Sequence, residues 1–259
     1  MLLLSGSRQS LTGRLGGVGL LINKSLNESI LEISSICDRI CYVTIKLTSR
    51  YCCQIFQVYA PTSSHSNESV EEFYTALQNA LNNKQHHYKI IIGDFNAKIG
   101  KKSVQEMSMG NFGVGQRNER GNRLVEFAEF NNLSIMNSFF CKNPANKWTW
   151  QSPKGDINEI DFILTNIRSV VTDVSVINKV DIGSDHRLVR AKVAIKPKIE
   201  RAKLMNNNAD SGNNKVNIAN LNAEKAEFQH QLSEKFSRLN FDAGLNELNS
   251  SIGTILQET

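Results

Sequence analysis

The chain has 259 residues, a formal net charge of +5, 40% hydrophobic residues and 21% charged residues. These values describe an ordinary folded protein, and the mild basicity suits a polyanionic partner without requiring one. No apolar run approaches the ~20 residues that a membrane helix needs, and residues 1–4 are too few for a signal-peptide core. We therefore expect an intracellular protein. None of the five cysteines has zinc-site spacing, so we expect reduced, mostly buried thiols.

The first part of the chain predicts strands followed by a helix. Residues 16–22 indicate a strand entered through a glycine turn; a phosphate-binding loop is the weaker alternative, because its remaining glycine, its lysine and its helix are absent. The β-rich runs over residues 40–47 and 52–59 predict an antiparallel hairpin. Asn67 is expected to cap a helix. Its apolar face would comprise Val70, Phe73, Leu77 and Leu81.

The rest of the chain alternates irregularly between strands, loops and helices. Residues 97–118 predict a surface loop, and residues 122–131 a second helix. Further strands are expected over residues 133–140, 147–151, 160–164, 174–180 and 188–195. Because several strands run in consecutive pairs, we predict an α/β sandwich of two mainly antiparallel sheets with outer helices. Residues 199–219 are Asn-rich and predict a linker, and residues 220–259 predict a helical tail.

A buried strand over residues 88–93 leads into the sequence Gly93-Asp94-Phe95-Asn96. Asp94 and Asn96 are two residues apart, so in an extended segment their side chains point to the same side. A carboxylate there can orient or deprotonate a water, and a carboxamide can donate to an oxyanion. The alternative is a simple turn after the strand, since Asp and Asn are favoured turn residues.

Two other polar sites have the composition of catalytic groups. Asp161 lies in an otherwise apolar strand, where a carboxylate needs a cation, a donor or a metal. Ser184-Asp185-His186 precedes the last strand and supplies such partners. Asp161 can orient His186, while Asp185 and Asp94 can gather a divalent cation through the oxygen ligands that Mg²⁺ prefers. Each of these residues taken alone also has an ordinary structural explanation.

The order of these motifs resembles that of the endonuclease/exonuclease/phosphatase superfamily. The motifs are Tyr59-Ala60-Pro61, Gly93-Asp94-Phe95-Asn96, Thr149-Trp150, Ile160-Asp161-Phe162-Ile163 and Ser184-Asp185-His186. The chain looks most like endonuclease domains of non-long-terminal-repeat retrotransposons (LINE elements) and their craniofacial-development-protein-2-like relatives, because of residues 118–124, Phe127 and residues 137–140. The tail then resembles the spacer before a reverse transcriptase. The resemblance implies a four-layer sandwich.

The resemblance also implies roles for individual residues in phosphodiester hydrolysis. Asp94 would position or deprotonate the attacking water, and Asn96 would stabilise the pentavalent phosphate. Asp161 would orient His186, which would contact the scissile phosphate. Tyr59 would provide a further phosphate contact. The substrate implied is DNA, and the location implied is the nucleus.

A divalent cation, Mg²⁺ or Mn²⁺, is the cofactor that the resemblance implies. Asp185 would sit at the metal together with Asp94. Thr149, Trp150 and Ser184 would support the site without taking part in the chemistry. No organic cofactor and no membrane partner are implied, and the oligomeric state stays open.

The chain departs from the superfamily pattern at its start. The resemblance implies two strands ahead of Gly16, one carrying an Asn and the next a metal-ligating Glu, but residues 1–15 contain neither residue. We therefore expect the domain over residues 1–198 to be N-terminally incomplete and to lack the first strands of one sheet. Glu159 stands where relatives usually have Gln and adds a charge beside the site.

Two further functions stay open beside a DNA endonuclease. One is an inactive remnant that at most binds nucleic acid, for which the missing Glu is the reason. The other is a phosphatase on a small phosphorylated substrate, because the superfamily's catalytic set serves both reactions.

Overall fold

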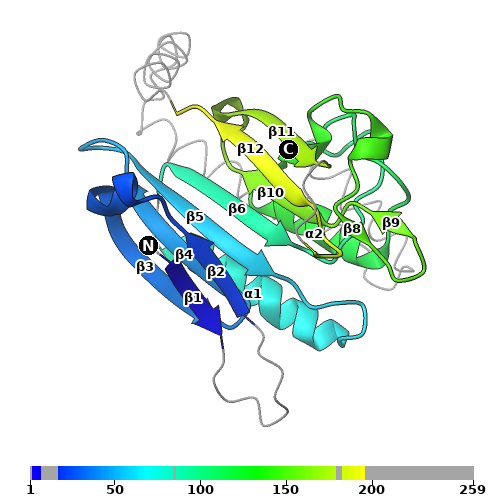
Figure 1. Ribbon diagram of the computed structural model, residues 1–259, viewed down its shortest axis with the longest axis horizontal. Helices are drawn as coiled ribbons and strands as arrows, with labels where there is room; N and C mark the ends of the chain where they lie inside the picture. The colour runs from blue at the N-terminus through cyan, green and yellow to red at the C-terminus, as the bar shows by residue number, and fades with distance from the viewer. Residues whose placement is uncertain (1, 7–16, 84–85, 179–182, 196–259) are drawn as a thin grey trace, which may run out of the picture. The chain divides into compact units, whose positions relative to one another are not determined.

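The computed structural model describes residues 2–6, 17–83, 86–178 and 183–195 (Figure 1). The strands are β1 (Leu2–Gly6), β2 (Gly17–Leu21), β3 (Ile30–Cys37), β4 (Ile40–Lys46), β5 (Cys52–Tyr59), β6 (Tyr88–Asp94), β7 (Ser134–Ile135), β8 (Trp150–Gln151), β9 (Ile157–Asn158), β10 (Asp161–Thr165), β11 (Val171–Ile177) and β12 (Leu188–Val193); the helices are α1 (Asn67–Asn83) and α2 (Glu119–Phe130). No helix in these ranges is long and apolar enough to cross a membrane. The expected linker and tail, over residues 199–259, lie outside the described residues.

The largest sheet has six strands in the order β3-β4-β5-β6-β10-β7. The predicted hairpin is confirmed, since β4 and β5 pair antiparallel from Ile40 opposite Val58 to Lys46 opposite Cys52. β5 and β6 pair in parallel, and α1 forms the crossover between them, as a parallel pair requires. The other pairs of this sheet are antiparallel. The predicted α/β class is therefore confirmed.

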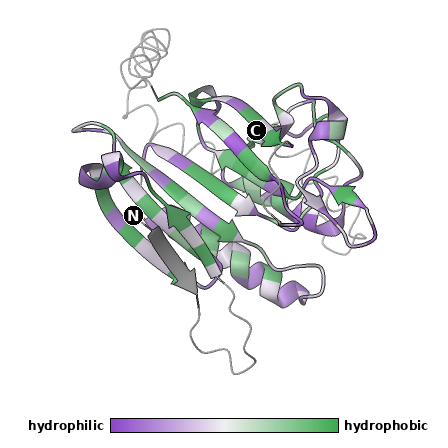
Figure 2. Ribbon diagram, in the orientation of Figure 1, coloured by the Kyte–Doolittle hydropathy of each residue, from purple (hydrophilic) through white to green (hydrophobic). Residues whose placement is uncertain are grey.

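Alternate residues of the central strands face opposite sides of this sheet. On one side, Phe56, Ile91 and Phe162 pack with α1 and α2 through residues such as Leu77 and Leu124. Figure 2 shows the corresponding mixture of apolar and polar residues along the strands. Both described helices cover this one face of the sheet. The apolar residues that recur along each helix sequence therefore determine which side of the helix packs on the sheet.

The opposite side is covered by two separate two-stranded sheets, β1–β2 and β11–β12. β2 lies over β4 and β5, and β12 lies over β10 (Figure 1). Val18 and Leu20 of β2 pack on Cys41 and Val43. Val174 of β11 belongs to a different cluster, which includes residues of β6 and β10. The second layer thus consists of two hairpins that each carry their own apolar core.

Several local predictions were wrong at the boundaries of elements. The strand expected over residues 133–140 is only β7, followed by a 3₁₀ turn at Met136–Ser138, because side-chain hydrogen bonds from Asn137 replace the strand ladder. Residues 2–6 and 30–37 form strands that were not predicted. The α1 cap is Ser66, whose Oγ accepts from the Ser69 amide, and Asn67 lies inside the helix.

Other predictions need smaller corrections. α2 begins at Glu119, three residues before the expected start, because Asn118 accepts a hydrogen bond from the Gly121 amide and caps the helix. None of the five cysteines pairs in a disulfide, as expected, but only Cys41 and Cys53 are buried. The expectation of mostly buried thiols was therefore wrong.

Candidate active site

Three neighbouring strands end at the candidate site. Tyr59 is the last residue of β5 and pairs with Asp94, the last residue of β6. Asp94 in turn pairs with Asp161, the first residue of β10. By their alternation along the strands, these three side chains leave the sheet on the face opposite to the helices. Residues from distant parts of the chain thus meet at one edge through backbone pairing alone.

Gly93 allows β5 and β6 to approach closely just before the site. Its φ is +147°, and a Cβ atom at this position would lie 1.9 Å from the carbonyl oxygen of Val58. At the end of β6, the Asp94 carbonyl accepts a hydrogen bond from the Ala60 amide at 2.8 Å, and the Phe95 amide donates to the Ile160 carbonyl at 3.0 Å. The Asp94 backbone is therefore tied to both neighbouring strands.

Asp94 and Asn96 form a turn and also face the site. Asn96 has a left-handed φ of +49°, and its amide donates to Oδ1 of Asp94 at 2.7 Å. Its Nδ2 donates to the Ala60 carbonyl at 2.9 Å. A carboxamide has two N–H donors, so one remains for a ligand. The turn interpretation and the chemical interpretation of this motif are therefore compatible.

His186 is held against Asp161. Its Nδ1 lies 3.1 Å from Oδ2 of Asp161, and because a carboxylate only accepts, Nδ1 is the donor. This hydrogen bond is the main reason that the pKa of His186 is raised above its ordinary value. The buried Thr149 hydroxyl accepts from the amides of Ile160 and Asp161, and Ser184 Oγ accepts from the His186 amide. Thr149 and Ser184 thus hold the backbone that carries the pair.

Asp185 is fixed by Trp150, whose Nε1 donates to Oδ2 of the carboxylate at 2.9 Å. The Gln151 amide also donates to the Asp185 carbonyl, and Trp150 forms a β-bridge with His186. β8 therefore positions the segment that carries both Asp185 and His186.

The site concentrates negative charge around Asp94. Burial, and then the charge of Asp161, raise the pKa of Asp94 from 3.8 to about 6, although the Asn96 amide and His186 act in the opposite direction. Ligand atoms of Asp94, Asp161 and His186 all lie within 4.8 Å of one another. A divalent cation fits this donor set, because Asp94 and Asp161 offer the one or two carboxylates that Mg²⁺ ordinarily takes from a protein; Asp185, expected at the metal, is not part of this group.

One pocket of about 500 Å³ contains most of the predicted site residues. Tyr59, Asp94, Asn96, Trp150, Asp185 and His186 line it. Thr149, Ser184 and Asp161 are not among its lining residues, and Asp161 reaches it through His186.

Sequence reasoning missed several residues of the pocket wall. These are Thr62, Ser63, Lys98, Asn118, Asn158 and Ile160. Lys98 and Asn118 are joined by two hydrogen bonds, so the long loop between them starts and ends at the pocket. The signal that was available is Asn118 itself, a helix-capping residue type directly before α2.

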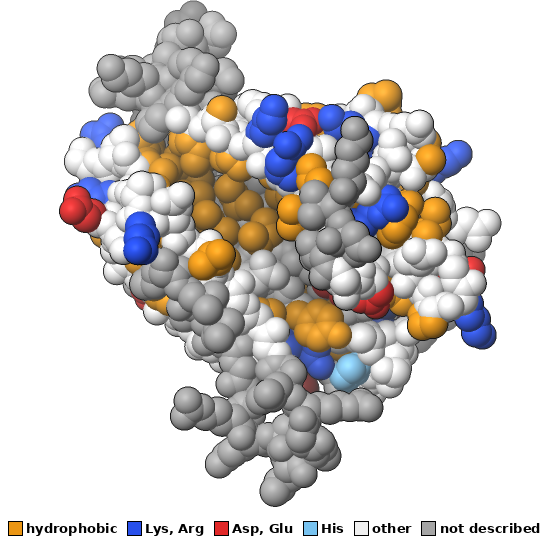
Figure 3. Space-filling model, viewed as in Figure 1, with side chains coloured by type: hydrophobic (Ala, Val, Ile, Leu, Met, Phe, Trp, Pro, Cys, Tyr) orange, Lys and Arg blue, Asp and Glu red, His pale blue; other side chains and the backbone are white. Residues whose placement is uncertain are grey.

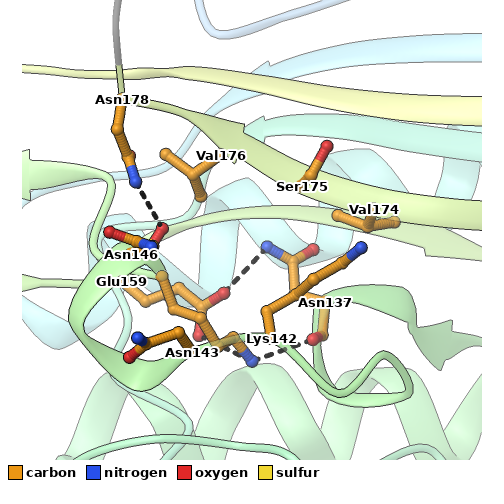
Figure 4. A pocket seen from close by; sticks show the side chains of 10 residues that line it. Asn137, Lys142, Asn143, Asn146, Glu159, Val174, Ser175, Val176 and Asn178 are labelled. Carbon is orange, nitrogen blue, oxygen red and sulfur yellow. Dashed lines mark hydrogen bonds and ion pairs between the residues drawn. The ribbon is translucent and has the colours of Figure 1, made fainter.

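The extra charge of Glu159 is balanced by a buried ion pair. Lys147 Nζ lies 3.6 Å from Oε2 of Glu159 and donates to the carbonyls of Phe112 and Asn137. Asn137 Nδ2 donates to Oε1 of Glu159 and to the Asp161 carbonyl. Figure 4 shows Asn137 and Glu159 on the wall of a separate pocket. Glu159 is therefore linked through Asn137 to Asp161, the first residue of β10.

The chain matches the family described as endonuclease-reverse transcriptase over residues 53–190. It belongs to this family and, with it, to the endonuclease/exonuclease/phosphatase superfamily.

The similar proteins include craniofacial development protein 2 of Bos taurus, which is 35% identical over 72% of this chain and 32% of its own length. The same protein of Tragulus javanicus is 34% identical over 72% of this chain and 33% of its own length. The chain thus spans about a third of the length of these curated relatives. A solved endonuclease/exonuclease/phosphatase family protein of Leptotrichia buccalis is 19% identical, with a TM-score of 0.42, over 60% of this chain and 53% of that one.

Proposed function

We propose that this chain is a divalent-cation-dependent DNA endonuclease of the retrotransposon type. The observation that carries the proposal is the meeting of Asp94, Asp185 and the Asp161-bound His186 around one open pocket. DNA as the substrate rests on membership of the family. For such a substrate we expect a nuclear location, which microscopy of the tagged chain would check.

The residues of the site have two kinds of role: one accepts a proton, and the others donate hydrogen bonds to the phosphate. Asp94, held by the Asn96 amide, accepts a proton from the attacking water once its carboxyl is ionised. His186, fixed through Nδ1 by Asp161, presents Nε2 to a phosphate oxygen. Asp94 and Asp161 would hold the cation, with Asp185 on the wall of the same pocket. The cation supplies charge neutralisation and activation of water when bound. The free N–H of Asn96 and the Tyr59 hydroxyl are further donors toward the phosphate.

Nicking of supercoiled plasmid by the purified chain tests this function. We expect nicking with Mg²⁺ or Mn²⁺ that is lost with EDTA, with Asp94→Ala and with His186→Ala. Asp156→Ala is the matched control, because Asp156 is an exposed carboxylate in a surface turn. Metal-independent DNA binding without nicking would instead identify an inactive remnant. Faster hydrolysis of soluble phosphomonoesters than of DNA would identify a phosphatase.

A further inference from the structure

Lys98 lies at the boundary between the candidate active site and a second pocket. Among the described residues that line the site pocket, it is the only lysine or arginine. It also lines a neighbouring pocket of about 230 Å³, which we name the Trp148 pocket. The wall of this pocket includes Lys98, Gln116, Pro144, Trp148, Ile157 and Asn158. Only Lys98 and Asn158 line both pockets, whereas Asp94 and Asn96 line the site pocket alone.

The backbone of Lys98 is fixed by the start of α2. The Lys98 amide donates to Oδ1 of Asn118 at 3.0 Å, and the Asn118 amide donates to the Lys98 carbonyl at 3.1 Å. The same Oδ1 accepts from the Gly121 amide at 2.8 Å and so caps the helix. A Cβ atom at Gly121 would lie 1.8 Å from the Lys98 carbonyl oxygen, so only glycine permits this approach. The Lys98 side chain therefore starts from a fixed point beside the site.

The ammonium group of Lys98 is free to bind a ligand. Lys98 is exposed, and within the described residues no carboxylate forms an ion pair with it. Nearby acids have other partners, since Asp185 accepts from Trp150 and Glu159 pairs with Lys147. A lysine ammonium binds phosphate as a point charge. Lys98 can therefore hold an anionic group at the rim of an otherwise acidic site.

A phosphate at Lys98 is different from the scissile phosphate. The donors proposed for the scissile phosphate, which are Asn96, His186 and Tyr59, line the site pocket and not the Trp148 pocket. Lys98 faces both pockets, so it lies to one side of these donors. A nucleic acid strand carries one phosphate per nucleotide, and a strand cut in the site pocket brings its neighbouring phosphate to this boundary.

The Trp148 pocket is separate from the uncovered apolar face of the sheet. Figure 3 shows that face as a hollow with hydrophobic side chains at its base, where Ile55 and Ile92 lie. It shares no described lining residue with the Trp148 pocket. The only lysine or arginine on its described wall is Arg187, whose guanidinium lies over the Trp148 ring. A phosphate backbone therefore finds a free cation at Lys98 and not on the sheet.

We propose that Lys98 binds the phosphate next to the scissile one, and that the strand continues from there into the Trp148 pocket. The inference rests on the proposed function and adds a residue that holds the substrate away from the reacting atoms. Such a contact is equally strong in the ground state and in the transition state, so its loss should raise KM and leave kcat nearly unchanged.

Binding of a short DNA duplex to the full chain in EDTA tests the contact without cleavage. The slope of log affinity against log salt concentration changes by about 0.9 for each phosphate contact. We expect Lys98→Met to reduce the magnitude of this slope by about 0.9 and Lys98→Arg to preserve it. Because Lys98 is exposed, neither substitution should affect folding. Lys46→Met is the matched control, since Lys46 is an exposed lysine that pairs with Cys52, at the end of β5 away from Tyr59.

Neutral methylphosphonate linkages locate the phosphate that Lys98 binds. The wild-type chain with Mg²⁺ first defines the cut position in a duplex, and a methylphosphonate then replaces the phosphate on either side of it, one at a time. On one side, the replacement should raise KM by about tenfold for the wild-type chain. It should change little for Lys98→Met, because both changes remove the same contact. For all of these pairs, kcat should stay within about twofold.

Three outcomes would overturn the inference. They are no binding of the duplex, a salt slope for Lys98→Met equal to that for Lys46→Met, and additive KM losses from Lys98→Met and the methylphosphonate on both sides. The second outcome together with normal nicking would leave the proposed nuclease function intact. Conversely, a chain that does not nick DNA but loses salt slope with Lys98→Met would contradict the nuclease function and support the phosphate contact.

Discussion

Asp94 and Asp161 occupy directly paired positions on the antiparallel strands β6 and β10. Two carboxylates therefore face each other across one rung of a sheet, and only one of them, Asp161, has a histidine partner. Burial is the larger cause of the raised pKa of Asp94, and this pairing explains why the charge of Asp161 raises it further. A cation or a bound proton would therefore stabilise the site.

Asp94→Asn should stabilise the metal-free protein at neutral pH while abolishing activity. Because the pKa of Asp94 rises from 3.8 to about 6 on folding, the folded state binds more protons in this window and stability falls as pH rises through it. Asn keeps the acceptor for the Asn96 amide but carries no charge. The full shift corresponds to roughly 3 kcal/mol, so we expect a gain of about 1–3 kcal/mol at pH 7.5.

Urea denaturation with EDTA at pH 4 and pH 7.5 checks this gain. The stability gain of Asp94→Asn should nearly vanish at pH 4, where Asp94 is protonated in the folded wild-type protein. Asp156→Asn is the control and should change stability little at either pH. An Asp94→Asn protein that is less stable than wild type at pH 7.5 would contradict the prediction.

Asp161→Asn should lower the pKa of His186 toward its ordinary value of 6.5, because the charged acceptor at Nδ1 is removed. Histidine NMR titration of the metal-free protein measures the shift. The Asp161–His186 hydrogen bond also contributes to the free energy of unfolding, and the raised pKa of His186 fixes how this contribution depends on pH. It is full below pH 6.5 and is lost as pH rises through the pKa of His186 in the folded protein. Ser184→Ala removes a hydrogen bond but no charge, and should leave the pKa of His186 unchanged.

Lys147→Met should destabilise the protein by about 3–5 kcal/mol, because it leaves Glu159 buried without its cation. The double variant Lys147→Met with Glu159→Gln should recover most of this loss, since no unpaired charge remains. Lys142→Met breaks the more exposed pair with Asp173 and should cost less than about 1 kcal/mol. Chemical denaturation of all three variants provides the comparison, and a double variant no more stable than Lys147→Met would show that the unpaired charge of Glu159 is not the cause of the loss.

Gly93→Ala should cost more than about 3 kcal/mol and reduce activity, because a Cβ atom would collide with the Val58 carbonyl in the neighbouring strand. Gly155→Ala is the control that measures the cost of backbone strain without a collision. Gly155 also has a positive φ, +93°, but open space around its Cβ position, so its replacement should cost about 1–2 kcal/mol. Equal losses in thermal or chemical denaturation would show that the close approach of β5 and β6 is unimportant.

The sequence was most informative where polar residues interrupt apolar strands. Asp94 and Asp161 were found because a carboxylate in or after a buried run needs a chemical explanation, and the motif order linked them to His186. Their direct pairing could not be predicted, because no local signal says which distant strands become neighbours. Lys98 was missed for a related reason: residues 97–118 have no periodicity that would fix their direction.

Asn137 shows a different limit of sequence reasoning. The apolar residues around it predicted a strand over residues 133–140, but its side chain accepts from the Ile163 amide and donates to the Asp161 carbonyl. A side chain that replaces backbone pairing in this way leaves no trace in hydrophobic periodicity. The same limit hid the pairing of Lys147 with Glu159.

Tyr59, Asp94 and Asp161 lie side by side in one row across three hydrogen-bonded strands, with no lid or long loop needed to bring them together. Their relative positions should therefore persist on heating until the sheet itself melts. Heat inactivation and global unfolding would then occur at one temperature. α1 and α2 pack on the far side of the sheet through residues such as Leu77 and Leu124. This packing should therefore determine the temperature up to which the site residues keep their positions, although the site lies on the opposite face.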